Sequence, residues 1–173
     1  MRDPDDFDVF YTGTVRRVTS YLYTVTGSRA EAEDAAQEAY ARAWQRWDKI
    51  SGYGDPEGWV RTVGYRIAVN AWRRGVTRAA AHRRHGLPAD EPGLSPDYLA
   101  IVAALRKISP GQRQAIVLHY VLGLSVEEIA REAGLPAGTV KARLARGRQA
   151  LAPLLGDSAP GPGFSGQEVA NNA

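Results

Sequence analysis

Residues 124–144 read LSVEEIAREAGLPAGTVKARL, and they contain the clearest structural pattern in the C-terminal half of the chain. Ser125 is a favourable helix N-cap, and Gly134 stands in a short turn between two segments of helical periodicity. The apolar residues of the two segments would share one seam: Val126, Ile129, Ala130, Val140 and Leu144. Two short helices joined by a glycine turn over a common seam predict a helix-turn-helix unit.

The second helix of this unit has an apolar stripe and an opposite face suited to DNA. At about 100° per residue, Val140, Leu144 and Leu151 fall within about 40° of one another. Small side chains let a helix approach base edges, while Lys, Arg and Gln reach bases or phosphates. The residues expected to contact DNA are Thr139, Lys141, Ala142, Arg143, Ala145, Arg146 and Gln149. The alternative is a basic, solvated helix, and the adjoining helix, turn and seam favour DNA over it.

The remainder of the chain also has helical rather than strand-like periodicity. Helices are expected at about 6–25, 29–47, 56–74, 96–108, 110–122, 125–133 and 136–155. Ser28 with Glu31 is typical of a capping box, and Asp55 before Pro56 is typical of an N-cap. The fold class is therefore all-α, with two small helical domains joined by a flexible linker. The domains are expected at 1–74 and 94–155, the linker at 75–93 and a disordered tail at 156–173.

Composition and charge restrict the classes of function. The 173 residues contain no cysteine, and no apolar run approaches the length of a membrane span, so a cytoplasmic protein is expected. The net charge is only +3, but residues 58–89 and 133–156 contain basic residues and no acid. Two separate basic stretches suit contact with a phosphate backbone at two places, although solvated helix faces would give the same pattern.

The helix expected at 29–47 has a polar, acid-bearing face. Ala36, Ala39, Tyr40, Ala43 and Trp47 lie on one side of it and would face the core. Asp34, Gln37 and Glu38 point outward. Taken alone, this pattern indicates an ordinary solvated face.

The helix expected at 56–74 mixes aromatic residues with arginines. Trp59, Tyr65 and Trp72 stand among Arg61, Arg66, Arg73 and Arg74. This arrangement suits stacking on unpaired bases beside phosphate contacts. Core packing of the two tryptophans is an equal alternative.

These motifs together resemble the extracytoplasmic-function (ECF) subfamily of the sigma-70 RNA polymerase sigma factors. The resemblance rests in the C-terminal half on SPGQRQAIVL (109–118), GLS (123–125), EEIA (127–130) and GTVKARL (138–144). In the N-terminal half it rests on AEDAAQEAYARAW (32–44), PEGWVR (56–61) and WRR (72–74). The motifs occur in the family's order and spacing and cover most of residues 6–155.

The resemblance implies a factor that directs core polymerase to promoters and helps to melt the −10 region. The helix-turn-helix would read the −35 element through the seven residues named above. Contact with the clamp helices of the largest polymerase subunit would fall to Asp34, Gln37 and Glu38. The −10 element would be bound by Trp59, Arg61, Arg66, Asn70, Arg73 and Arg74. The polymerase flap and an anti-sigma factor are further partners that the resemblance implies.

The sequence departs from the family pattern at two places. A gapless match puts Arg66 where the family usually has an asparagine. Alternatively residues 65–70 match the family motif ending in asparagine, which selects Asn70 and puts Trp59 out of register. Both alternatives remain open. Pro136 stands where the family often has a serine cap, and proline is tolerated at a helix start.

No cofactor, metal site or catalytic role is expected. His82 and His85 have metal-ligand spacing with His119 as a third candidate, but arginines surround the pair and cysteine is absent. Two other functions compete with a sigma factor. A dimeric helix-turn-helix repressor or activator accounts only for the C-terminal domain, and an RNA-binding anti-terminator is the second alternative.

Overall fold

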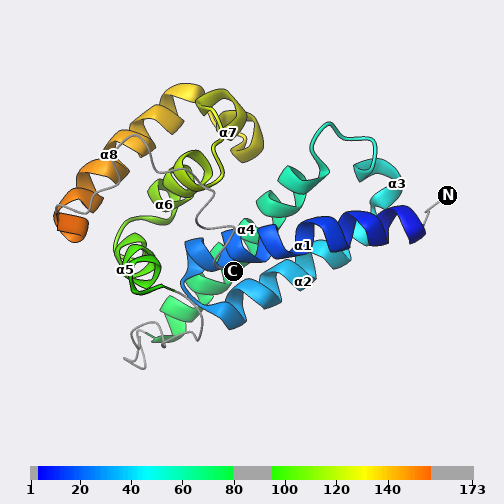
Figure 1. Ribbon diagram of the computed structural model, residues 1–173, viewed down its shortest axis with the longest axis horizontal. Helices are drawn as coiled ribbons and strands as arrows, with labels where there is room; N and C mark the ends of the chain where they lie inside the picture. The colour runs from blue at the N-terminus through cyan, green and yellow to red at the C-terminus, as the bar shows by residue number, and fades with distance from the viewer. Residues whose placement is uncertain (1–3, 80–94, 157–173) are drawn as a thin grey trace. The chain divides into compact units, whose positions relative to one another are not determined.

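The computed structural model describes residues 4–79 and 95–156, and all regular elements in these ranges are helices (Figure 1). The chain divides into two compact units, residues 1–85 and 86–173. The expected all-α fold with two helical domains is confirmed. Residues 1–3, 80–94 and 157–173, which include His82, His85, most of the expected linker and nearly all of the tail, lie outside the described residues.

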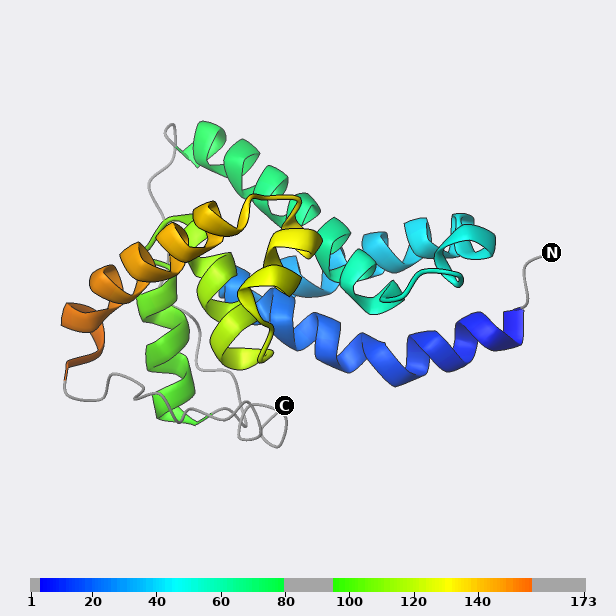
Figure 2. The ribbon, with the colours of Figure 1, turned by 90° about the horizontal axis from the view of Figure 1, so that it is seen from above.

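Unit 1 is built from three long helices and one short one. They are α1 (Pro4–Thr26), α2 (Arg29–Gln45), α3 (Trp47–Ile50) and α4 (Pro56–Ala79). The helices α1 and α2 lie side by side, and α4 packs against both (Figures 1 and 2). The fully buried side chains at their junction include Val18, Leu22, Ile50 and Val60.

Local capping explains where these helices begin. Ser28 Oγ accepts from the Glu31 N–H at 3.3 Å, but the Ser28 N–H donates to Thr26 Oγ1 at 3.2 Å. The predicted cap is therefore confirmed, although the return bond of a capping box is made by a different residue. Asp55 Oδ1 accepts from the Gly58 N–H at 2.8 Å, as expected of an N-cap.

Two helix ends differ from the sequence expectation. The helix α2 ends at Gln45 rather than at Trp47, because Arg46 leaves helical geometry with φ −121° and ψ 18°. The helix α4 continues to Ala79 instead of ending at Arg74. A glycine inside a helix costs only about 1 kcal/mol relative to alanine, and the first proline after Gly75 is Pro88, beyond the end of α4. Residues 75–79 therefore belong to α4 and not to the linker.

An aromatic cluster joins the first half of α1 to α3 and to the second half of α2. The rings of Phe7 and Phe10 lie 5.2 and 4.8 Å from that of Trp47, centroid to centroid. Tyr40 Oη is 2.7 Å from Thr14 Oγ1, and burial raises the pKa of Tyr40 to about 12. This packing fixes the rotation of α2 about its axis, so that its acidic face must point away from α1.

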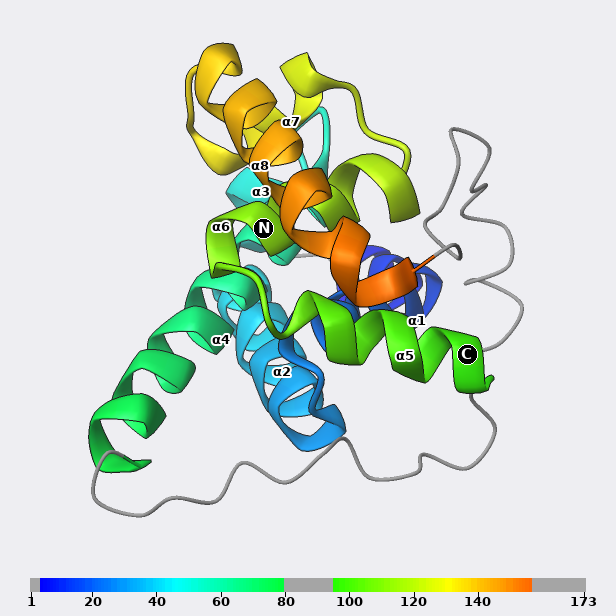
Figure 3. The ribbon, with the colours of Figure 1, turned by 90° about the vertical axis from the view of Figure 1, so that its left-hand side faces the viewer.

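Unit 2 is organised around its last helix. Its elements are α5 (Pro96–Leu105), α6 (Pro110–Ile116), a π-helical turn η1 (Val117–Val121), α7 (Val126–Ala133) and α8 (Ala137–Leu155). The helices α5, α6 and α7 all pack against α8 (Figure 3). The α6 contact is close because Gly147 lacks a side chain: a Cβ there would lie 2.8 Å from Ile116 Cγ1.

Candidate nucleic-acid interface

The helix-turn-helix is formed by α7, a glycine turn and α8. Ser125 Oγ accepts from the Glu128 N–H at 3.2 Å, and Glu128 Oε2 accepts from the Ser125 N–H at 2.8 Å. Gly134 then ends α7 with φ 67°, a left-handed conformation that costs glycine little. The predicted seam is formed, with Ile129, Val140 and Leu144 buried. The turn thus holds the start of α8 at a fixed angle to α7.

The cap of α7 should make the stability of unit 2 depend on acid pH. The hydrogen bond from the Ser125 N–H lowers the pKa of Glu128. A lowered folded-state pKa gives stability that is present above the ordinary glutamate pKa and lost as pH falls through the lowered value. We therefore expect Glu128→Gln to flatten the loss of stability below about pH 5, measured by thermal unfolding at a series of pH values.

Glu127→Gln is the matched control for this experiment. Glu127 is also exposed in the first turn of α7, but within the described residues it makes no hydrogen bond. Its variant should keep the pH dependence of the parent protein. If Glu128→Gln and the parent lose stability in parallel below pH 5, the cap is not the titrating group.

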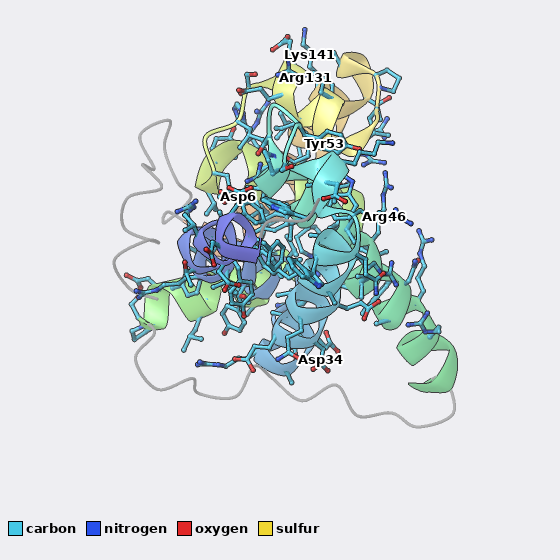
Figure 4. All side chains as sticks on the ribbon, turned by 90° about the vertical axis from the view of Figure 1, so that its right-hand side faces the viewer. Asp6, Asp34, Arg46, Tyr53, Arg131 and Lys141 are labelled. Atoms are coloured by element: carbon cyan, nitrogen blue, oxygen red, sulfur yellow. The ribbon has the colours of Figure 1, made fainter. Side chains whose placement is uncertain are left out.

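The face of α8 that was expected to contact DNA is accessible. Lys141, Ala145, Arg146 and Gln149 are exposed, and Lys141 projects outward from the start of α8 (Figure 4). The other three expected residues, Thr139, Ala142 and Arg143, are half-buried. Small and basic side chains therefore share one surface, opposite the buried Val140, Leu144 and Leu151.

A second surface of mixed character runs along α4. At about 100° per residue, Trp59, Arg66, Asn70 and Arg73 fall within about 60° of one another. Arg66, Asn70 and Arg73 are exposed, and Trp59 is half-buried. We call these four residues the α4 stripe. Arg74 is exposed at its edge, whereas Trp72, although 43% exposed, lies on a different side of the helix.

Arg61 does not belong to the α4 stripe. Its side chain is 9% exposed, about 200° away from Trp59 around the helix, and forms ion pairs with Asp55 at 3.2 Å and Glu57 at 3.4 Å. Glu57 also pairs with Arg17 of α1 at 2.7 Å, and this contact raises the pKa of Arg17. Arg61 therefore anchors the start of α4 inside unit 1. The four-residue spacing of Glu57 and Arg61 is the sequence signal for this pairing.

The outward face of α2 is as expected. Ala36, Ala39, Tyr40 and Ala43 of α2 are all buried, as is Trp47, which lies in α3. Asp34, Gln37 and Glu38 are exposed, and Asp34 projects from the surface of unit 1 (Figure 4). Glu38 makes an exposed ion pair with Arg42 at 2.8 Å. Such a pair contributes little to stability and leaves the carboxylate accessible to a partner.

Sequence reasoning missed the role of Arg113. Although it is charged, it is only 8% exposed, and its guanidinium donates to the main-chain oxygens of Leu105 at 2.8 Å and of Arg106 and Ile108 at 3.2 Å. These carbonyls end α5 and the turn that follows it, so Arg113 holds α5 and α6 together. Arg113 is flanked by Gln112 and Gln114, so its neighbours in the sequence give no signal for this role.

In the described ranges no cluster of three His, Asp or Glu side chains could hold a metal ion. His119 Nδ1 instead lies 2.8 Å from the Leu124 carbonyl oxygen. No helix within residues 4–79 and 95–156 has the length and apolar character needed to cross a membrane.

Comparison with known proteins identifies both units. Residues 10–78 match the family model for Sigma-70 region 2, and residues 98–151 match that for Sigma-70, region 4. The ECF RNA polymerase sigma factor SigL of Mycobacterium tuberculosis is 34% identical over 131 residues, which cover 72% of this chain and 74% of SigL. The chain belongs to the ECF RNA polymerase sigma factors. Unit 1 is thus the region 2 unit of this sigma-70 family member, and unit 2 is its region 4 unit.

Other relatives support the same family. The ECF RNA polymerase sigma factor BldN of Streptomyces coelicolor is 30% identical over 86% of this chain, and the chain covers 59% of BldN. The chain thus spans about three fifths of the length of that relative. Among solved structures, the sigma factor RpoE of Bartonella quintana, in complex with the anti-sigma factor NepR, matches with a TM-score of 0.75 at 25% identity. That match covers 87% of this chain and 96% of RpoE.

Proposed function

We propose that this ECF family member directs core RNA polymerase to specific promoters and helps to melt the −10 region. The observation that carries the proposal is the accessible basic face of α8, set on a rigid helix-turn-helix, in the same chain as a region 2 unit. A DNA-reading helix alone would equally suit a repressor. A repressor would not need a region 2 unit with an acidic α2 face and the α4 stripe, so the presence of this unit favours a sigma factor.

Unit 2 would read the −35 element from the major groove. Ala142 and Ala145 are small enough to let α8 approach the base edges, while Lys141 and Arg146 supply hydrogen-bond donors. The remaining residues of the face, Thr139, Arg143 and Gln149, would contact phosphates or neighbouring bases.

Unit 1 would bind one strand of the −10 element in its unpaired, melted form. The α4 stripe offers an aromatic ring for stacking and arginines for phosphates on one side of one helix. Removing a base from the stack costs a few kcal/mol, which such contacts offset. Arg66 and Asn70 lie about 40° apart on this stripe, so either can stand near the same base. Arg74 would contact the backbone at the edge of the stripe, whereas Arg61 would support the helix without touching DNA.

The partners follow from the same assignment. Asp34, Gln37 and Glu38 would bind the clamp helices of the largest polymerase subunit, and unit 2 would dock on the polymerase flap. An anti-sigma protein is a further proposed partner, because RpoE of Bartonella quintana is similar and was solved with one. The protein would act in the cytoplasm without catalysing a reaction itself.

Reconstitution with purified bacterial core polymerase tests this function. Genomic DNA fragments are transcribed with and without the protein, and the 5′ ends of the RNA are sequenced. A sigma factor yields start sites with a shared upstream element only when both proteins are present, and by itself it binds those fragments weakly. Tight binding of duplex DNA by the isolated chain would instead support a repressor. Failure to bind core polymerase would overturn the proposal.

Reversing one charge on α2 should weaken the complex with core polymerase. We expect Glu38→Arg to reduce core affinity by about tenfold or more, because like charges placed across an interface are strongly unfavourable. The affinity is measured by titrating labelled protein with core polymerase. The helix itself should stay folded, since only an exposed ion pair with Arg42 is lost.

Glu33→Arg is the matched control. Glu33 is similarly exposed on the same helix and forms an equivalent ion pair with Arg29 at 2.9 Å. It lies about 140° from Glu38 around the helix. Because Glu33 also lies about 40° from Gln37, equal losses of core affinity in the two variants would show that the position of Glu38 itself is not decisive.

A further inference from the structure

Gly111 and Arg143 are in direct contact across two helices of unit 2. Gly111 lies in the first turn of α6, and Arg143 is on α8. A Cβ built on Gly111 would lie 2.9 Å from Arg143 Cζ and 3.1 Å from both Nε and Nη1. Because Cζ is the nearest atom and the two nitrogens are equally distant, the Cβ position lies over the flat face of the guanidinium. The Arg143 guanidinium therefore packs face-on against the backbone of Gly111.

This contact leaves the N–H donors of the Arg143 guanidinium available. The N–H groups of a guanidinium lie in its plane, so stacking of its face on Gly111 does not occupy them. Within the described residues Arg143 makes no hydrogen bond or ion pair, although it is half-buried. Around α8 it lies about 60° from Arg146, beside the face assigned to DNA. A packed but unpaired guanidinium at this place suits an acceptor supplied from outside the protein.

We propose that Gly111 is a positioning residue, which seats Arg143 in the orientation that contacts a phosphate of the −35 DNA. The inference rests on the proposed function of unit 2. A side chain at position 111 cannot coexist with the seated guanidinium, because Cβ contacts below 3.0 Å essentially do not occur. The displaced atoms belong to the end of a flexible side chain. The fold should therefore survive substitution while the DNA contact is lost.

Gly111→Ala tests the proposal in the reconstituted holoenzyme. The probe is a promoter fragment recovered in the transcription experiment above, titrated at several salt concentrations. We expect about three- to tenfold weaker binding and a salt dependence smaller by about one counterion, as for a single lost phosphate contact. The melting temperature should be unchanged or higher, because alanine favours a helix more than glycine does.

A double-mutant comparison separates seating of Arg143 from a general effect. Arg143→Ala should weaken binding about as much as Gly111→Ala, and the two changes together should cost no more than either alone. Gly13→Ala in α1 is the control, since a Cβ there meets nothing within 4 Å. It should leave promoter affinity unchanged.

Two results would overturn the proposal. One is unchanged affinity in Gly111→Ala, and the other is an equal further loss when Gly111→Ala is added to Arg143→Ala. Either result leaves the sigma function intact as long as the parent holoenzyme binds the fragment. If the parent holoenzyme selects no promoter, the proposed function has failed instead.

Discussion

Replacement of Arg113 by methionine is expected to lower the melting temperature of unit 2 by about 15 °C, corresponding to about 3 kcal/mol in a domain of this size. The buried guanidinium donates to the carbonyls of Leu105, Arg106 and Ile108, which close α5 and the turn after it. Methionine fills much of the same volume but donates no hydrogen bond. Each buried acceptor left without a partner costs about 1–3 kcal/mol. A small helical domain has little stability to lose.

The tryptophans allow this effect to be assigned to one unit. All four, Trp44, Trp47, Trp59 and Trp72, lie in unit 1. Circular dichroism, which follows helices in both units, should show an earlier transition in Arg113→Met. Tryptophan fluorescence should show the transition of the parent protein. Arg106→Met, a half-exposed arginine nearby in the same unit, is the control and should change neither signal. An unshifted circular dichroism transition in Arg113→Met would refute the role of this arginine.

The second large effect concerns transcription. Arg146→Ala should reduce transcription from the cognate promoter by about tenfold or more while leaving core binding unchanged. Arg146 is exposed on the face of α8 that carries Ala142 and Ala145. A bidentate arginine contact to a base contributes about 1–3 kcal/mol of discrimination. The measurement is run-off transcription with reconstituted holoenzyme, alongside a core-binding titration. Normal transcription in this variant would remove the α8 face from the proposed interface.

Arg148→Ala provides the matched control for Arg146→Ala. It removes the same charge from the same helix, but about 160° away from Arg146. Its guanidinium donates to Tyr120 Oη at 3.1 Å and so turns toward η1. Only a small loss, arising from the change in overall charge, is expected. If both variants lose transcription equally, basic charge and not the position of Arg146 sets promoter binding.

The helices and their faces could be read from the sequence because the responsible interactions are short-range. Ser28, Asp55, Ser109 and Ser125 each cap a helix through an N–H three residues further along the chain. Burial along α2 follows the helical period without exception among the residues assigned to its core. The end of α4 was misplaced because Gly75 weakens a helix without stopping it.

The arginines were harder to assign, since their role depends on what lies opposite. Arg61 and Arg66 look alike in the sequence, yet one is buried in a network with Asp55 and Glu57 and the other is exposed. An arginine side chain can be buried in an ion-pair network or exposed at the surface, because its aliphatic part packs against apolar neighbours while its guanidinium remains able to form ion pairs or contact solvent. Spacing from Trp59 would have separated the two arginines, as they lie on opposite sides of α4.

The all-α class, the helix-turn-helix and the outward faces of α2 and α8 follow from the amino-acid sequence alone, because caps and amphipathic periods act within a few turns of one helix. Which arginines are held by contacts between helices could be seen only once the helices were packed together. Arg113 is committed to the carbonyls that end α5, and Arg143 is seated on a glycine of α6. Both contacts join separate helices, and no local pattern of residues specifies which side chain a neighbouring helix will bring into reach.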